Sequence, residues 1–123
     1  MKRNPVGWFE IYVQDMARAK AFYEGVFQTR LERLNSPQIE MWMFPADMEA
    51  PGSGGSLVSN PGVRPGGNST VIYFSCRDCA EEEARIPGLG GRIHRPKISI
   101  GEYGFVTLAF DTEGNLFGLH SLE

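Results

Sequence analysis

Several features that mark whole classes of protein are scarce or missing in this sequence. It has only two cysteines, and without an evident secretion signal we expect them to be reduced thiols rather than a disulfide. No apolar run approaches the roughly 20 residues of a membrane-spanning helix, and no apolar segment follows the charged N-terminus, so neither a membrane span nor a signal peptide is expected. The net charge is −3 and no run of lysine or arginine occurs, which argues against a nucleic-acid partner. These absences predict a cytoplasmic protein.

The sequence does contain the composition of a folded domain and an internal repeat. Of its 123 residues, 41% are hydrophobic and 22% are charged, as in globular proteins. Residues 7–27 and residues 70–90 each join an alternating strand pattern to an aspartate, Asp15 or Asp78, that can cap a following helix. A repeat of this length indicates two copies of one supersecondary unit, neither of which can bury its apolar face alone. We therefore expect the copies to pack or pair, with the functional site between them.

Periodicity predicts the order β-α-β-β-β for each copy. In the first strand Phe9, Ile11 and Val13 point to one face, which the apolar stripe of the following helix can cover. That stripe consists of Ala19, Phe22, Tyr23 and Val26. The first copy is predicted to have strands at residues 8–13, 29–34, 38–44 and 55–58 and a helix at 16–26. The second is predicted to have strands at 70–76, 91–97, 103–110 and 115–121, a helix at 79–86, and a hairpin turn at Gly114-Asn115.

Four short segments of the chain form an ordered set of motifs. They are Asp15 to Tyr23, Gly90-Gly91, Ile100 to Phe105 and Asp111 to Leu119. Together they resemble the vicinal oxygen chelate superfamily, which includes glyoxalase I, bleomycin-resistance proteins and extradiol dioxygenases. The resemblance implies an α+β fold, with a single glyoxalase-like domain over residues 1–123, module one at about 5–60 and module two at about 68–123. The two βαβββ modules would form a cup-shaped mixed sheet with helices on its outer face. The resemblance also implies a homodimer, in which the modules of one cup come from one chain or from two.

Metal-dependent relatives take one ligand from the first strand and one from the last strand of each module, usually His, Glu or Gln. Counting from the helix-capping aspartates and from Asp111 places three of these positions on Trp8, Val71 and Gly118, and the module-one counterpart of Gly118 lies near Ser56. Such residues do not make a metal-binding set. Glu10 and His120 lie two residues along the same strand faces, but a catalytic zinc normally takes three ligands from protein. We therefore expect no metal and no cofactor; recruitment of a metal by Glu10 and His120 is the open alternative.

Cys76 and Cys79 form a C-x-x-C sequence at the junction of a predicted strand and helix, where a helix N-terminus can lower the pKa of a thiol. The intervening Asp78 disfavours a thiolate, and Cys76 continues the apolar series of Ile72 and Phe74. The pattern therefore indicates buried core cysteines more than a redox centre.

The candidate ligand site is a set of aromatic residues around one carboxylate. Trp8, Glu10 and Tyr12 share the face of the first strand opposite to Phe9. An inward carboxylate between aromatic rings suits a general base or an anchor for a cationic ligand group. The alternative is a structural glutamate bonded to a backbone amide or a neighbouring tyrosine. The predicted ligand-binding residues are Trp8, Glu10, Tyr12, Trp42, Tyr73, Phe105 and His120.

Three functions are compatible with this site. The first is metal-free binding of a small aromatic or amphipathic molecule in the cup between the modules, as the resemblance to bleomycin-resistance proteins implies. The second is a lyase or isomerase that acts on a small carbonyl compound with Glu10 as catalytic base, with or without a divalent metal. The third is a dimerising module whose cup is filled by aromatic core residues. Because the fold alone does not choose among them, whether the protein is an enzyme stays open.

Overall fold

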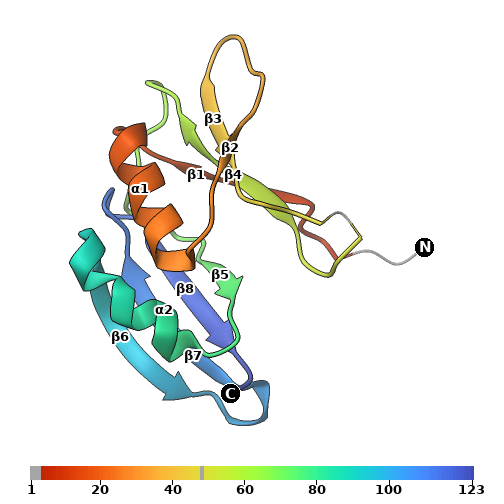
Figure 1. Ribbon diagram of the computed structural model, residues 1–123, viewed down its shortest axis with the longest axis vertical. Helices are drawn as coiled ribbons and strands as arrows, with labels where there is room; N and C mark the ends of the chain where they lie inside the picture. The colour runs from red at the N-terminus through yellow and green to blue at the C-terminus, as the bar shows by residue number, and fades with distance from the viewer. Residues whose placement is uncertain (1–3, 48) are drawn as a thin grey trace.

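The computed structural model describes residues 4–47 and 49–123 and shows two successive β-α-β-β-β modules (Figure 1). Module one contains β1 (Trp8–Tyr12), α1 (Met16–Phe27), β2 (Glu32–Arg33), β3 (Glu40–Met43) and β4 (Gly54–Ser59). Module two contains β5 (Ile72–Ser75), α2 (Cys79–Arg85), β6 (Arg92–Ser99), β7 (Phe105–Phe110) and β8 (Leu116–Ser121), with 3-10 helices η1 (Pro87–Leu89) and η2 (Gly101–Tyr103). The predicted element order is confirmed in both modules.

Each module folds into its own four-stranded mixed sheet. Sheet one has the strand order β1-β4-β3-β2 and sheet two has the order β5-β8-β7-β6. In each, the first strand runs parallel to the last, and the remaining pairs are antiparallel. The register is also repeated, because Glu10 pairs with Ser56 and Tyr73 pairs with Gly118. The predicted α+β duplication is therefore confirmed at the level of hydrogen-bonded pairs.

The aspartates that join strand to helix cap both helices, as predicted. The side chain of Asp15 accepts a hydrogen bond from the backbone N–H of Arg18 at 3.0 Å. The side chain of Asp78 accepts one from the N–H of Ala80, also at 3.0 Å. Each bond satisfies an amide that the first helical turn leaves unpaired, which fixes where the helix begins.

The predicted strand at residues 29–34 is reduced to the two residues of β2. The reason lies in the helix before it. Gln28 takes up the left-handed conformation that ends α1, and the N–H of Leu31 bonds to the side chain of Glu24 at 2.9 Å. The segment after the helix is therefore held to α1 and cannot pair with β3 until Glu32.

A second difference lies before β7, which was predicted to begin at residue 103. The structure has the short helix η2 there instead, and β7 begins at Phe105. A turn accounts for the change, because the N–H of Ile100 bonds to the carbonyl of Gly104 at 2.8 Å. The predicted turn at Gly114 is confirmed, with a φ of 81° that suits glycine.

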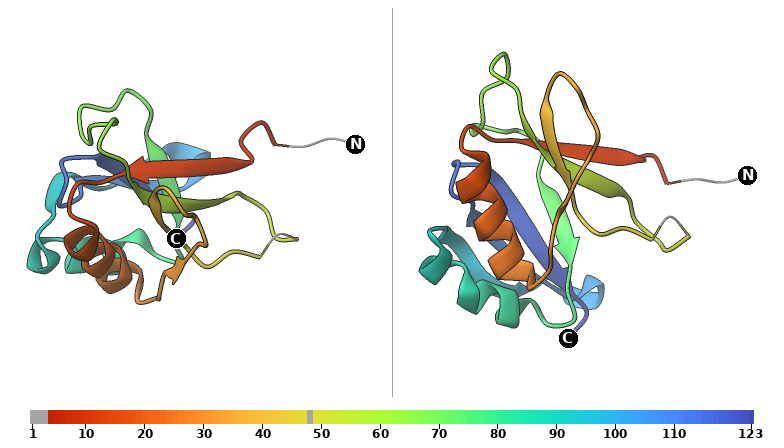
Figure 2. Two further views of the ribbon diagram at one scale, coloured as in Figure 1. Left: turned by 90° about the horizontal axis from the view of Figure 1, so that it is seen from above. Right: turned by 45° about the horizontal axis from the view of Figure 1, so that its top comes forward.

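The core is shared between the modules. The predicted stripe of α1 is fully buried, with Ala19, Tyr23 and Val26 at 0% exposure and Phe22 at 1%. It meets aromatic residues from both sheets: the ring centroids of Tyr23 and Phe44 are 5.5 Å apart, and those of Phe22 and Phe117 are 5.9 Å apart. Figure 2 shows both helices on the same side of the two sheets.

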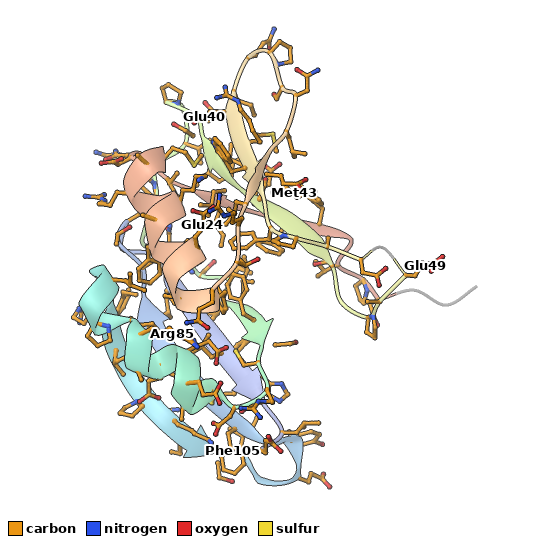
Figure 3. The ribbon with its side chains drawn as sticks, viewed as in Figure 1. Glu24, Glu40, Met43, Glu49, Arg85 and Phe105 are labelled. Carbon is orange, nitrogen blue, oxygen red and sulfur yellow. The ribbon has the colours of Figure 1, made fainter. Side chains whose placement is uncertain are left out.

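The two helices lie side by side along one side of the molecule, with Arg85 between them (Figure 3). Its guanidinium donates to the carbonyl of Val26 at the end of α1, at 3.0 Å.

The side of each sheet that the helices do not cover is called its open face. It carries Trp8, Glu10 and Tyr12 in sheet one and Tyr73 in sheet two. Within the described residues, no helix has the length and apolar character to cross a membrane.

Candidate functional site

A cavity of about 650 Å³ lies between the two modules. Its walls come from β1, from the beginning of β5, and from the linker that joins β4 to β5. Both strands are at the edges of their sheets, so the cavity opens where the repeated units face each other. Four of the seven predicted ligand-binding residues line it: Trp8, Glu10, Tyr12 and Tyr73. The aromatic rings of the last two and of Trp8 give the cavity large apolar surfaces around one carboxylate.

The carboxylate of Glu10 is held by its aromatic neighbours on β1. The indole N–H of Trp8 donates to Oε2 at 3.3 Å, and the hydroxyl of Tyr12 donates to Oε1 at 2.7 Å. The hydrogen bond to Glu10 raises the pKa of Tyr12, and burial and the negative charge add to that effect. The alternating pattern of β1 produces this arrangement, because residues 8, 10 and 12 project from one face.

Tyr73 occupies the corresponding place in module two. Its ring lies across Gly118 of β8, so that a Cβ atom added to Gly118 would come within 2.3 Å of the ring. Tyr73 is nevertheless 47% exposed. Glycine at position 118 is therefore required by the close approach of an aromatic ring whose other face is available to a ligand.

The structure does not bring Trp42 and Phe105 to the open faces. Trp42 pairs with Leu57 on the helix-covered face of sheet one, and the ammonium of Lys20 lies 4.6 Å from its ring centroid. Phe105 packs against the core and has the ammonium of Lys97 at 4.7 Å. Figure 3 shows Phe105 at the end of sheet two that is remote from β1. Side chains alternate between the two faces of a strand, so the adjacent residues Met43 and Val106 project from the open faces instead.

His120 lies on the open face of sheet two but outside the cavity lining. It pairs with Ser75 of β5, and its Nε2 atom is 2.7 Å from the carbonyl oxygen of Tyr103. That contact ties β8 to the short helix η2. His120 therefore does not line the described cavity with Glu10, and its role in ligand binding stays a prediction.

The residues at the positions that the resemblance assigns to metal ligands do not fit a metal. Gly118 is covered by the ring of Tyr73. Ser56 is fully buried opposite Glu10, and its hydroxyl has no hydrogen-bond partner among the described residues. Across the part of the chain that the structure describes, no three His, Cys, Asp or Glu side chains come together in a way that could hold a metal ion. We therefore derive no chemical step through a metal.

The turn of residues 111–115 joins the modules through a buried carboxylate. Asp111 is 5% exposed and accepts hydrogen bonds from the hydroxyl of Tyr23 at 2.7 Å and from the side-chain amide of Asn115 at 3.0 Å. Burial raises the pKa of Tyr23 well above its ordinary value, and the Asp111 charge reinforces the shift. The motif that carries part of the family resemblance thus has a structural role in this chain.

Glu113 in the same turn binds the beginning of α1. Its side chain is 1% exposed and accepts hydrogen bonds from the backbone N–H groups of Gln14 and Asp15 at 2.8 and 3.0 Å. The guanidinium of Arg18 lies 2.7 Å away. Burial alone would raise the pKa of Glu113, but these donors outweigh it and hold the pKa below its ordinary value.

Residues 64–68 of the linker form a wall of the cavity that no pattern in the sequence predicts. Asn115 accepts from the N–H of Gly66 at 2.6 Å and donates to the carbonyl of Tyr12 at 3.1 Å. Asn68 bonds to both backbone groups of Leu116. Asparagines are common in turns, but these partners lie 48 to 103 positions away, so no local pattern identifies them.

The C-x-x-C sequence is not an activated thiol pair. Cys79 is fully buried and Cys76 is partly buried, and both are free thiols. Burial raises the pKa of Cys76 to about 12, and the nearby charge of Glu82 contributes. At neutral pH the nucleophilic thiolate is therefore scarce, which agrees with the prediction of core cysteines.

Comparison with known proteins places this geometry in a family. Residues 6–119 match the Glyoxalase/Bleomycin resistance protein/Dioxygenase superfamily. No curated protein matches the sequence. Among solved structures, an antibiotic binding protein named TnmS3 from a Streptomyces species is 23% identical, with a TM-score of 0.68 over 100% of this chain and 99% of that one.

Two further structures extend the likeness. A family enzyme from Burkholderia phytofirmans is 13% identical, with a TM-score of 0.69 over 95% of this chain and 98% of that one. A glyoxalase I variant from Zea mays is 20% identical, with a TM-score of 0.74 over 95% of this chain but only 46% of its own. These identities support the fold, and the match over residues 6–119 supports the family. The chain belongs to the glyoxalase/bleomycin resistance protein/dioxygenase superfamily.

Proposed function

We propose that this protein binds a small aromatic or amphipathic molecule, without a metal, in the cavity between its two modules. The observation that carries the proposal is the composition of the cavity wall, which is lined by the rings of Trp8, Tyr12 and Tyr73 together with the carboxylate of Glu10. Its volume of about 650 Å³ lies within the range of small-molecule sites, which combine apolar walls with a few polar groups. The rings thus offer stacking surfaces and Glu10 offers one orienting contact.

The resemblance to the Streptomyces protein is consistent with this function. That protein is described as an antibiotic binding protein, and it matches this chain over nearly its whole length. Binding that sequesters a compound needs no catalytic residue. It would therefore suit a member of the family in which Trp8, Ser56, Val71 and Gly118 stand at the metal positions.

Tryptophan fluorescence tests the proposal because the two tryptophans lie on opposite faces of sheet one. In a Trp42→Phe variant, Trp8 is the remaining reporter, and a ligand in the cavity should quench it in a saturable way. A Trp8→Phe variant keeps Trp42, which packs beside Lys20 outside the cavity, and should show little quenching. If no compound from a broad set of aromatic metabolites and antibiotics quenches Trp8 or stabilises the fold, the binding proposal is wrong.

An enzymatic function is the second candidate, with Glu10 as a base acting on a small carbonyl compound. The observation in its favour is that Trp8 and Tyr12 fix the carboxylate within a cavity. The same bonds occupy one lone pair on each oxygen, which favours an anchoring role over proton abstraction. Glu10→Gln distinguishes the enzyme from the binding protein. Loss of turnover with retained ligand binding would establish Glu10 as the catalytic base. A protein that only binds its ligand has no turnover to lose.

We also propose that the protein is a homodimer whose contact includes the corner of module two formed by β6 and η2. Ile98, Ile100 and Tyr103 are 45%, 40% and 69% exposed there, and neighbouring exposed apolar residues commonly mark protein interfaces. Sedimentation of the wild-type chain should give twice the monomer mass. Ile98→Glu should lower the association constant at an unchanged circular dichroism spectrum, and a wild-type monomer would contradict the proposal.

A further inference from the structure

The cavity carries charge in only two side chains of its described lining, Glu10 on β1 and Arg64 on the linker. Neither takes part in an ion pair within the described residues. Glu10 lies between Trp8 and Tyr12 along β1, and each of its two carboxylate oxygens accepts a hydrogen bond from one of them. An oriented carboxylate beside aromatic rings is a specific chemical environment and not a general apolar pocket.

Aromatic rings carry negative potential on their faces, so they attract an organic cation that lies over them. Trp8, Tyr12 and Tyr73 come from two different strands, and Trp8 and Tyr73 keep 38% and 47% of their surface exposed. The carboxylate of Glu10 adds a full negative charge within the same lining. The indole N–H of Trp8 and the hydroxyl of Tyr12 are the groups that donate to Glu10, so these bonds do not use the ring faces.

From this arrangement we infer that the ligand carries an organic ammonium group, which sits against Glu10 and the rings of Trp8, Tyr12 and Tyr73. The inference rests on the proposed binding function and names the chemical class of its ligand. The rings exclude water from an alkylated ammonium and Glu10 neutralises its charge, so a cation binds more tightly than an uncharged molecule of the same shape. Arg64 opposes the cation, and its removal strengthens binding.

Titration with shape-matched probes tests this inference. Benzyltrimethylammonium and the uncharged neopentylbenzene have nearly the same shape and differ in charge, and phenylacetate supplies an anion of similar size. Binding is followed by quenching of Trp8 in the Trp42→Phe background. We expect the cation to bind at least about tenfold more tightly than the uncharged analogue, as the attraction between a desolvated cation and aromatic faces provides, and phenylacetate to bind more weakly than either.

Glu10→Gln should remove the advantage of the cation, because the amide keeps the shape and the hydrogen bond from Tyr12 while losing the charge. Glu32→Gln is the matched control: Glu32 pairs with Met43 on the open face of sheet one and does not line the cavity. The advantage should survive there. Arg64→Ala should increase the affinity for the cation.

The outcomes separate this inference from the proposed function. If both probes bind equally, or if the advantage of the cation persists in Glu10→Gln, the ammonium assignment is wrong while small-molecule binding stands. If neither probe binds but another compound quenches Trp8, the assignment is again wrong and binding again stands. If no compound of any charge quenches Trp8, both fail.

Discussion

Individual carboxylates in this chain have different roles because of the donors around them. Glu113 is almost fully enclosed and accepts three hydrogen bonds from the beginning of α1. Asp111 is buried within its own turn and binds Tyr23. Among the described residues, Glu10 accepts hydrogen bonds from Trp8 and Tyr12, two positions away on its own strand, and it lines the cavity. The first two therefore hold the modules together, whereas Glu10 bonds within its own strand, including to the neighbouring tyrosine as the structural alternative predicts, and lines the cavity.

Glu113 predicts a loss of stability in acid. Its pKa is lower in the folded protein than in the unfolded chain, so its contribution is fully present above the unfolded pKa of about 4.3. The contribution is lost as the pH falls through the lower, folded pKa. We expect the free energy of unfolding of the wild-type chain to fall in this window. Glu113→Gln, measured by urea unfolding from pH 7 to pH 3, should be less stable at pH 7 and should lose less below pH 4.3; parallel curves would contradict this role.

Cys76 predicts slow thiol chemistry. With its pKa raised to about 12 by burial and by Glu82, it should react with iodoacetamide far more slowly at pH 8 than a free cysteine does. A Cys79→Ala variant isolates the reaction of Cys76, and mass spectrometry follows alkylation against pH. Rapid labelling at neutral pH would revive the redox interpretation of the C-x-x-C sequence.

On the open face of sheet two, the ring of Tyr73 in β5 packs against Gly118 in β8. A methyl group at position 118 would lie 2.3 Å from the ring, so Gly118→Ala should destabilise the fold by about 1–3 kcal/mol, as overpacking does. Tyr73→Ala removes the obstacle. The double variant should therefore be more stable than the sum of the single changes predicts, as a double-mutant cycle by urea unfolding can measure. Simple additivity would show that the ring moves aside without cost.

At the level of strands and helices, much of the fold follows from local patterns. Alternation assigned Trp8, Glu10 and Tyr12 to one face of β1, and the apolar stripe of α1 was predicted residue by residue. Alternation does not show which face of β3 the helices cover, so the placement of Trp42 on the covered face required its pairing with Leu57. The length of β2 was not predictable, because it depends on the bond between Leu31 and Glu24.

Over the whole molecule, contacts between the modules shape the cavity, and those contacts are not encoded locally. Phe74 of β5 packs against Phe9, Phe27 and Phe44 of module one, at centroid distances of 5.9, 4.6 and 5.4 Å. The repeat predicted that the modules meet, but not that the linker closes one wall of the cavity. The position of a cavity between the modules therefore agrees with the repeat, whereas the complete lining of the cavity required the structure.

We propose that the cavity binds a small molecule without help from a metal. The most direct measurement is the dissociation constant of a ligand that quenches Trp8, determined in the Trp42→Phe variant before and after exhaustive chelation. We predict an unchanged constant and a ligand that is recovered chemically intact. A dissociation constant that rises on chelation and returns to its first value when a divalent metal is added would show that binding depends on a metal.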